Sequence, residues 1–297
     1  MASVPPETTL NGHAVREPEI LPPAGGYVPQ AEPVRRRKSA LKAAPATHLL
    51  VGINCLVFLL MVARGISPVS PTVDQLMNWG ANNAGAVLNY GNLFGYAEWW
   101  RVVTAMFLHV GILHLATNMW CLWNLGMLAE PLIGSFGLFA AYILTGAAGN
   151  LLSTWENWVW PIRDAGQIMF PAGAGASGAV FGIAGLLIIL LKSPRLPVPE
   201  KELKRLRRSV IYFAAINLVI GLSISGGNHF VHSGLNIDNM AHLGGFTSGL
   251  LFAMPMVPRI GSPRSTFQTR LRAALVMMVG LLVLFGFYIA NVQPPQA

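Results

Sequence analysis

Two polar residues stand at the heads of apolar segments that are far apart in the chain. Ser177 lies in the run Gly-Ala-Ser-Gly at 175–178, and His242 lies in the run Ala-His-Leu-Gly-Gly at 241–245. Polar groups inside hydrocarbon are costly, so residues of these types in such segments indicate a functional site. A serine hydroxyl becomes a nucleophile when a base within hydrogen-bond reach takes its proton, and an imidazole is such a base. The pair therefore predicts acyl transfer by a Ser–His dyad.

A second polar pair, His114 and Asn118, can supply the hydrogen-bond donors that acyl transfer needs. The two residues are four positions apart and share one face of a helix. Each donor to the developing oxyanion is typically worth about 2.7–4 kcal/mol. We expect the imidazole, the Asn118 amide and the backbone N–H of Ser177 to form this site, helped by the dipole of the helix that begins there. The alternative role for His114 and Asn118 is hydrogen bonding between helices.

Glycines flank both members of the predicted dyad. Gly178 and Gly182 form one GxxxG pattern, and Gly245 and Gly249 form another. This pattern lets two helices approach closely within a membrane, which would bring the serine and the histidine together. Taken alone, the glycines also fit a packing role without chemistry.

The elements that must position these residues are membrane-spanning helices. The chain is 53% hydrophobic and only 11% charged, and its mean hydropathy is positive. A helix needs roughly 20 apolar residues to cross a hydrocarbon core of about 30 Å. Seven stretches of about this length are predicted as spans, at 47–63, 110–129, 135–152, 176–192, 209–225, 239–257 and 273–290. The predicted fold class is therefore all-α, a polytopic membrane helix bundle.

The Lys and Arg residues predict the orientation of these spans. Seventeen of the twenty fall before the first span, between the fourth and fifth, or between the sixth and seventh, whereas Arg64, Arg101 and Arg163 fall on the other side. Positive charge favours the cytoplasm, so we expect the N-terminus inside and the C-terminus outside. Topology explains the net charge of +8, and no nucleic-acid partner is expected.

This orientation places the candidate site residues at one depth. The second, fourth and sixth spans all run inward from the outer face, and His114, Ser177 and His242 lie near their starts. Three residues from distant parts of the sequence can therefore meet about one or two helical turns below the outer surface.

Residues 1–46 differ in composition from the rest of the chain. They contain eight prolines and no sustained apolar period, which predicts a disordered Pro-rich cytoplasmic tail. The basic run 35–38 is interpreted as a topology signal, with binding of anionic headgroups as the alternative. The first apolar run starts far from Met1, so no signal peptide is expected and the first span serves as the insertion signal.

The sequence predicts no cofactor and no metal. Cys55 and Cys121 both fall inside spans and form no CxxC pair, and the chain contains no HExxH motif and no glycine-rich phosphate loop. His229 and His232 form an i, i+3 pair in a predicted outer loop, and a metal role for them is the alternative.

At this point the motifs together resemble the rhomboid intramembrane serine proteases. The matching features are the runs at 175–178 and 241–245, the segment 109–118 that contains His114 and Asn118, Trp100 and Arg101 upstream of it, and Glu130 and Gly134 after the second span. The resemblance covers about residues 47–257. The order of all these motifs on the predicted helices is specific, although each motif alone is weak.

The resemblance implies roles for individual residues. Ser177 and His242 would act as a dyad without a catalytic acid, and His114 and Asn118 would assist the oxyanion. Trp100 and Arg101 would belong to a membrane-embedded first loop, with His109 in a structural role there. The other residues implied near the site are Gly175, Gly178, Phe181 and Gly245.

Two features of this chain distinguish it from some rhomboids. Some rhomboids have a tyrosine where this chain has Phe181; a phenyl ring can still stack on the imidazole but has no hydroxyl. Residues 258–297 form a basic linker and a seventh span after the core at 47–257, similar to the six-plus-one arrangement of some rhomboids. The role of the seventh span is open.

The activity implied is cleavage of transmembrane segments of membrane proteins, through a Ser–His dyad and an acyl-enzyme intermediate. The expected partners are single-span protein substrates and the lipid bilayer, and the expected location is a bacterial plasma membrane. The loop at 226–238 is a hypothetical cap that moves to admit substrate. The alternatives are a non-catalytic relative that binds transmembrane helices and a small-solute transporter.

Overall fold

The computed structural model describes residues 9–10, 13–14, 44–92, 95–164, 166–192, 196, 199–226, 238–259, 263–293 and 295. The chain divides into two compact units, Met1–Lys38 and Ser39–Ala297. In the first unit, strands β1 (Thr9–Leu10) and β2 (His13–Ala14) pair antiparallel. Most of the predicted tail, including its basic run, lies outside the described residues.

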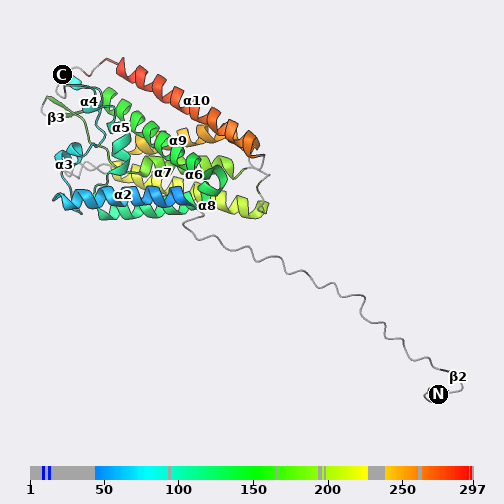
Figure 1. The fold of residues 1–297 in the computed structure, drawn as a ribbon. Helices are drawn as coiled ribbons and strands as arrows, with labels where there is room; N and C mark the ends of the chain where they lie inside the picture. Colours follow the sequence, from blue (N-terminus) through cyan, green and yellow to red (C-terminus); the bar gives the residue numbers. More distant parts are fainter. Residues whose placement is uncertain are drawn as a thin grey trace. The chain divides into compact units, whose positions relative to one another are not determined.

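Long helices make up the second unit (Figure 1). They are α2 (Pro45–Ala63), α6 (Ile112–Val159), α7 (Ser177–Leu190), α8 (Glu200–Gly226), α9 (Asn239–Ala253) and α10 (Arg264–Ala290). Four stretches in the described residues are long and apolar enough to cross a membrane, namely 45–63, 112–159, 239–257 and 264–290. The predicted polytopic helix bundle is confirmed.

The helix α6 covers two of the predicted spans. It has 48 residues, which at 1.5 Å per residue is more than twice the thickness of a hydrocarbon core of about 30 Å. The backbone leaves helical geometry at Gly134, where φ is +76°, and Pro131 precedes this break. A positive φ costs glycine little because it lacks a Cβ. The break therefore separates the second predicted span from the third.

The edges of the predicted spans differ from the helices in three places. The helix α7 is only 14 residues long, and it lies inside the predicted span 176–192. The helix α8 begins at Glu200 and α10 begins at Arg264, nine residues before each predicted span. These early turns carry charged residues, which hydropathy excludes from a span although they are good helix formers.

The core of this unit lies around α7. This helix packs against α6 and α9, and most of its residues are buried. A Cβ added to Gly245 would collide with the carbonyl oxygen of Gly178, and one added to Gly249 would collide with that of Gly182. The two GxxxG patterns thus face each other, and their backbones are in contact.

Two further helices flank this core. Figure 1 shows α2 and α10 on opposite sides of the unit, with α6 and α9 between them. The start of α2 is held by Glu130 of α6, whose carboxylate accepts hydrogen bonds from the backbone N–H groups of Ala46 and Thr47, both at 2.8 Å. The hydroxyls of Thr47 and Ser135 also donate to this carboxylate, at 2.7 and 2.6 Å. Glu130 therefore joins the first span to the break between the second and third.

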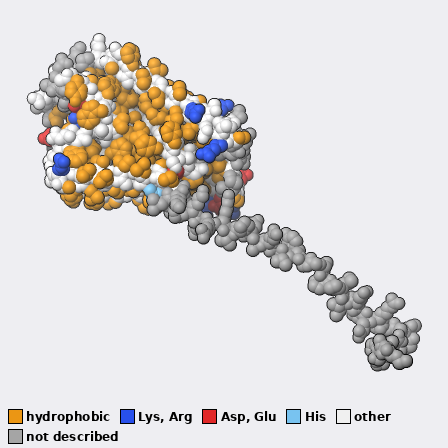
Figure 2. Space-filling view, in the orientation of Figure 1, with side chains coloured by type: hydrophobic (Ala, Val, Ile, Leu, Met, Phe, Trp, Pro, Cys, Tyr) orange, Lys and Arg blue, Asp and Glu red, His pale blue; other side chains and the backbone are white. Residues whose placement is uncertain are grey.

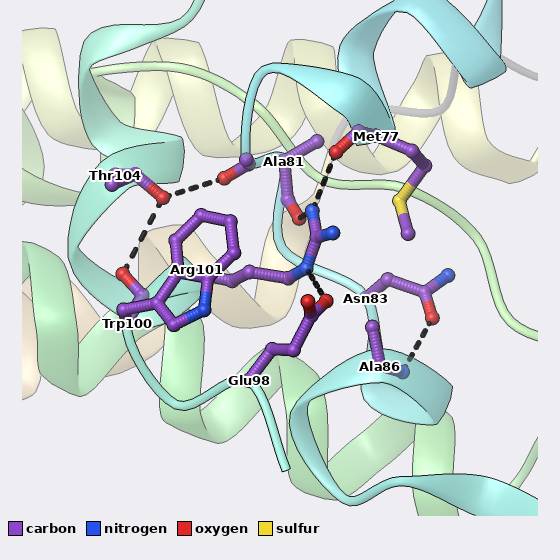
Figure 3. A network of polar contacts seen from close by, with 9 residues as sticks. Met77, Ala81, Asn83, Ala86, Glu98, Trp100, Arg101 and Thr104 are labelled. Carbon is purple, nitrogen blue, oxygen red and sulfur yellow. Dashed lines mark hydrogen bonds and ion pairs between the residues drawn. The ribbon is translucent and has the colours of Figure 1, made fainter. Parts of the chain in front are cut away.

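The long connection between α2 and α6 is a structured loop. It contains α3 (Val73–Asn78), α4 (Ala84–Val87), η1 (Tyr90–Asn92), α5 (Arg101–Thr104) and η2 (Ala105–Phe107). Arg101 is buried at its centre and donates to the carbonyl oxygens of Met77 and Ala81, at 2.7 and 3.1 Å, and to Glu98 at 2.6 Å (Figure 3). Its guanidinium also lies over the Trp100 ring, at 4.7 Å.

A short hairpin leads from α6 to the segment before α7. Strands β3 (Ile162–Asp164) and β4 (Gln167–Met169) pair antiparallel, with Ile162 opposite Met169. After η4 (Met254–Arg259), the chain enters α10.

Figure 2 shows hydrophobic side chains across the middle of the visible face of this unit, with Lys and Arg toward its edges. Such a surface fits a bilayer, where hydrocarbon covers the apolar band.

Candidate active site

The first turns of α7 and α9 bring Ser177 and His242 into contact. Ser177 is the first residue of α7, and Nε2 of His242 lies 2.8 Å from its Oγ. The distance lies within the range for proton transfer between a nucleophile and its base. A Cβ on Gly178 would lie 3.2 Å from the carbonyl oxygen of Ala241, which shows how closely the two helix starts approach. The glycines therefore make the hydrogen bond geometrically possible.

The His242 ring is held by stacking and by the start of its helix. Phe181 lies one turn after the serine, and its ring stacks on the imidazole with centroids 4.5 Å apart and an interplanar angle of 9°. Within the described residues, Nδ1 of His242 has no hydrogen-bond partner. No carboxylate among the described residues therefore orients this imidazole through Nδ1.

The start of α9 is capped by Asp238. Its carboxylate accepts from the backbone N–H of Ala241 at 2.8 Å and from the hydroxyl of Ser153 on α6 at 2.5 Å. Burial raises the pKa of this carboxyl above its ordinary value. Sequence reasoning did not identify Asp238, although an Asp directly before an apolar helix is a recognised N-cap signal. The cap links α9 to α6 one turn before His242.

The segment before Ser177 is held by the first loop. Asn82 and Gly173 exchange backbone hydrogen bonds of 2.8 and 2.7 Å, and Asn83 donates through its amide to the carbonyl oxygen of Phe170 at 2.7 Å. The backbone N–H of Gly175 donates to the carbonyl oxygen of Ala105 at 3.0 Å. These contacts hold the segment before Ser177 through first-loop residues that were not predicted to lie at the site.

His114 lies beside this segment, on the same cavity as the dyad. Gly175 has a φ of +146°, and a Cβ there would lie 2.8 Å from Cε1 of His114 and 3.7 Å from Oγ of Ser177. Only glycine therefore fits between the imidazole and the serine. The Asn118 amide donates to the carbonyl oxygen of His114, at 2.9 Å. The amide has a second N–H that this bond does not use.

A cavity of about 340 Å³ joins these residues. It is lined by Val110, His114, Thr117, Asn118, Cys121, Ala172, Gly173, Ala174, Ser177, Val180, Phe181, Phe213, Asn217, Asp238 and His242. Sequence reasoning did not place Phe213 or Asn217 at the site, because they lie in the middle of α8 without a motif around them. The lining combines an apolar wall with a few convergent polar groups, as in most small binding sites.

The other residues of the predicted site lie behind or outside this cavity. His109 is completely buried, and its ring lies 5.2 Å from that of His114. Burial lowers the pKa of His109 to about 3, so this ring is neutral where it packs. Trp100 and Arg101 belong to the first loop described above, and neither is among the residues that line the cavity.

The positions of the His, Cys, Asp and Glu side chains bear on metal binding. Among the described residues no group of three or more His, Cys, Asp or Glu side chains is placed to hold a metal ion. The pair His229 and His232 lies outside the described residues, as does most of the hypothetical cap at 226–238. Cys55 and Cys121 are free and half-buried, and Cys121 lines the cavity.

Comparison with known proteins gives the family. The family model of the Rhomboid domain matches residues 96–259, which is more than half of the chain and contains all the residues that line the cavity. This chain belongs to the rhomboid family. The resemblance expected from the motifs is confirmed.

Relatives of this rhomboid include named proteases. Rhomboid protease GluP of Bacillus subtilis is 31% identical over 243 residues, which cover 82% of this chain and 40% of that protein. Rhomboid protease AarA of Providencia stuartii is 29% identical over 264 residues, covering 85% and 86% of the two chains. RHOMBOID-like protein 1 of Arabidopsis thaliana is 33% identical over 162 residues, covering 54% and 36%. The chain thus spans less than half the length of the first and third of these relatives.

Proposed function

We propose that this rhomboid is an intramembrane serine endopeptidase that cleaves transmembrane segments of other membrane proteins. The observation that carries the proposal is the 2.8 Å contact between Oγ of Ser177 and Nε2 of His242 at the cavity. The relatives named as proteases support the same class of enzyme, a hydrolase of peptide bonds.

The reaction follows from the chemistry of a Ser–His pair. Oγ of Ser177 attacks the carbonyl carbon of the scissile bond while its proton passes to Nε2 of His242. When the tetrahedral intermediate collapses, the C–N bond breaks and the imidazolium gives that proton to the leaving amine. A water molecule then attacks the ester of the acyl-enzyme, again with His242 as base, and the serine is released.

The oxyanion of each tetrahedral intermediate needs donors, and three groups are proposed for this role. The backbone N–H of Ser177 is in the first turn of α7, where helix N–H groups have no partner within the helix. The second N–H of the Asn118 amide and the imidazole of His114 line the same cavity. The positive end of the α7 dipole adds to this field.

We also propose an orientation and a substrate class. The excess of Lys and Arg at one end of the spans favours an N-terminus in the cytoplasm and a C-terminus outside, in a bacterial plasma membrane. The dyad would then lie near the outer face. Substrates would be single-span proteins whose N-terminus is outside, with the scissile bond near small residues and helix-breaking sequence, because a peptide bond must leave its helix to reach the serine.

Cleavage of a single-span reporter protein by the purified enzyme in liposomes tests this function. Ser177→Ala and His242→Ala should each abolish cleavage while the thermal unfolding of the variants stays close to that of wild type. A fluorophosphonate probe should label wild type and fail to label Ser177→Ala. Cleavage that persists in Ser177→Ala would show that the nucleophile is another residue. A wild type that neither cleaves nor reacts with the probe would instead be a non-catalytic binder of transmembrane helices.

A further inference from the structure

The first turns of α8 present two different faces. Leu203, Val210 and Ala214 are buried against the rest of the unit. Lys201, Lys204, Arg205, Arg208 and Tyr212 are all exposed. Their spacing of three and four residues places the exposed side chains in one stripe along the helix. Together with Glu202 and Ser209, these five line a groove on the surface.

The stripe continues along α8 with a change of character. After Tyr212 the same face carries Ile216 and Val219, which are 57% and 60% exposed. From Arg208 to Val219 the helix advances about 16 Å, roughly half the thickness of a hydrocarbon core. The order is basic, then aromatic, then aliphatic. A bilayer leaflet shows the matching order of phosphate, interface and hydrocarbon.

The basic end of the stripe keeps an excess of positive charge. Lys204 forms an ion pair with Glu200, at 2.7 Å between exposed side chains. Within the described residues, no carboxylate forms an ion pair with Lys201, Arg205 or Arg208. Guanidinium groups bind phosphate oxygens in a bidentate manner, and lysine binds them as a point charge.

We propose that this face of α8 is a binding site for an anionic phospholipid. Lys201, Arg205 and Arg208 bind the phosphate of its headgroup, Tyr212 lies at the interface, and an acyl chain runs along the aliphatic continuation of the stripe. A soluble phosphate or an acidic peptide would use the basic residues but would leave the apolar side chain of Ile216 exposed to water. The continuity of the stripe therefore favours a lipid.

The side of α8 that packs against the rest of the unit contributes two residues to the cavity of the proposed active site. Phe213 and Asn217 line the catalytic cavity, and the Phe213 ring lies 6.1 Å from that of Phe181, which stacks on His242. A lipid bound along the exposed stripe therefore restrains the helix that forms one wall of the cavity. We expect cleavage to depend on anionic lipid for this reason; this second step rests on the proposed function, whereas lipid binding does not.

The test compares two sets of three substitutions in the full-length protein. The first set is Lys201→Gln, Arg205→Gln and Arg208→Gln on α8. The matched control is Arg264→Gln, Arg270→Gln and Arg272→Gln, which removes the same charge from the start of α10. Each protein is purified from mixed micelles of phosphatidylglycerol and phosphatidylcholine, and the retained lipids are measured by mass spectrometry.

The α8 variant should retain several-fold less phosphatidylglycerol than wild type, with phosphatidylcholine unchanged, and the α10 variant should retain the wild-type amount. Added NaCl should release phosphatidylglycerol from wild type, because salt screens exposed charges. The proposal is wrong if the α8 variant retains as much as wild type or if both variants lose lipid equally. It is also wrong if soluble glycerol phosphate displaces the lipid at equal concentration. If the α8 variant fails to fold, the salt and glycerol phosphate arms on wild type decide the question.

The coupling to the active site is tested in liposomes with and without phosphatidylglycerol. Wild type and the α10 variant should cleave the reporter several-fold faster when phosphatidylglycerol is present, and the α8 variant should lose this difference. Equal lipid dependence in the α8 variant would overturn the coupling. If wild type cleaves in neither lipid, the proposed function fails, and the lipid retention experiment still decides the binding site.

Discussion

At the scale of single residues, the site depends on residues that each make or permit one specific contact. Gly175 leaves room for His114 beside the serine, and Phe181 supports the imidazole by stacking on its face. Asn118 uses one amide N–H to bond the carbonyl oxygen of His114, which orients the other. Because the contacts differ, substitution of Asn118 should affect stabilisation of the oxyanion, whereas substitution of Phe181 should affect the support of the imidazole.

Substitution of Asn118 by alanine tests the oxyanion role. Loss of one donor to the oxyanion should reduce kcat/KM by about 10²- to 10³-fold, with little change in stability. The measurement is steady-state cleavage in liposomes. Thr117→Ala is the control, since Thr117 also lines the cavity but donates to carbonyl oxygens of its own helix, at 3.0 and 3.1 Å. Equal losses in the two variants would argue against the role of Asn118.

The stacked ring gives a second prediction. Phe181→Leu keeps an apolar side chain but removes the aromatic contact, which is worth about 0.5–1.5 kcal/mol, so kcat should fall roughly two- to tenfold. Phe181→Tyr should retain wild-type activity, since the ring face is unchanged. Kinetics of the two variants under identical conditions check this. If Phe181→Tyr is as slow as Phe181→Leu, ring stacking does not explain the contribution of Phe181 to kcat.

At the scale of elements, the candidate active site lies where the starts of two helices, α7 and α9, meet. The glycines of α7 and α9 set the distance between the helices, and the Asp238 cap sets the position of the first turn of α9 relative to α6. His242 lies one turn after that cap, so a change in the cap moves its imidazole relative to Ser177.

Removal of the cap should therefore affect catalysis more than binding. Asp238→Ala loses a capping interaction of about 1 kcal/mol, and we expect kcat to fall clearly while KM stays nearly constant. Asp238→Asn is the matched control, because asparagine also caps helices and can still bond Ser153. It should recover most of the lost kcat. If Asp238→Ala and Asp238→Asn both keep the kinetics of wild type, Asp238 contributes to stability alone.

At the scale of the whole molecule, three spans depend on one buried carboxylate. Glu130 accepts four hydrogen bonds from the start of α2 and from Ser135, next to the break at Gly134. It lies at the end of the second span, whereas Ser177 begins the fourth. Because the donors include two backbone N–H groups at a helix start, they have no other partner within the helix.

Glu130→Ala should lower stability more than it alters the chemistry. Buried donors left without an acceptor each cost about 1–3 kcal/mol, so we expect the free energy of unfolding to fall by at least about 2 kcal/mol. The free energy of unfolding of Glu130→Gln, which keeps one carbonyl oxygen, should lie between those of wild type and Glu130→Ala. Thermal unfolding in micelles measures both. Unchanged stability in the alanine variant would mean that water replaces the carboxylate.

The sequence by itself determined the polytopic helix bundle, the contact between Ser177 and His242, and the glycines that allow close helix packing. These features depend on local composition and on spacing within one helix, which a linear pattern contains. Tertiary structure alone revealed Phe213 and Asn217 at the cavity, the bond between Asp238 and Ser153, and the support of the segment before Ser177 by Asn82. Such contacts join residues far apart in the chain, and they depend on how the helices rotate and pack, which no local period specifies.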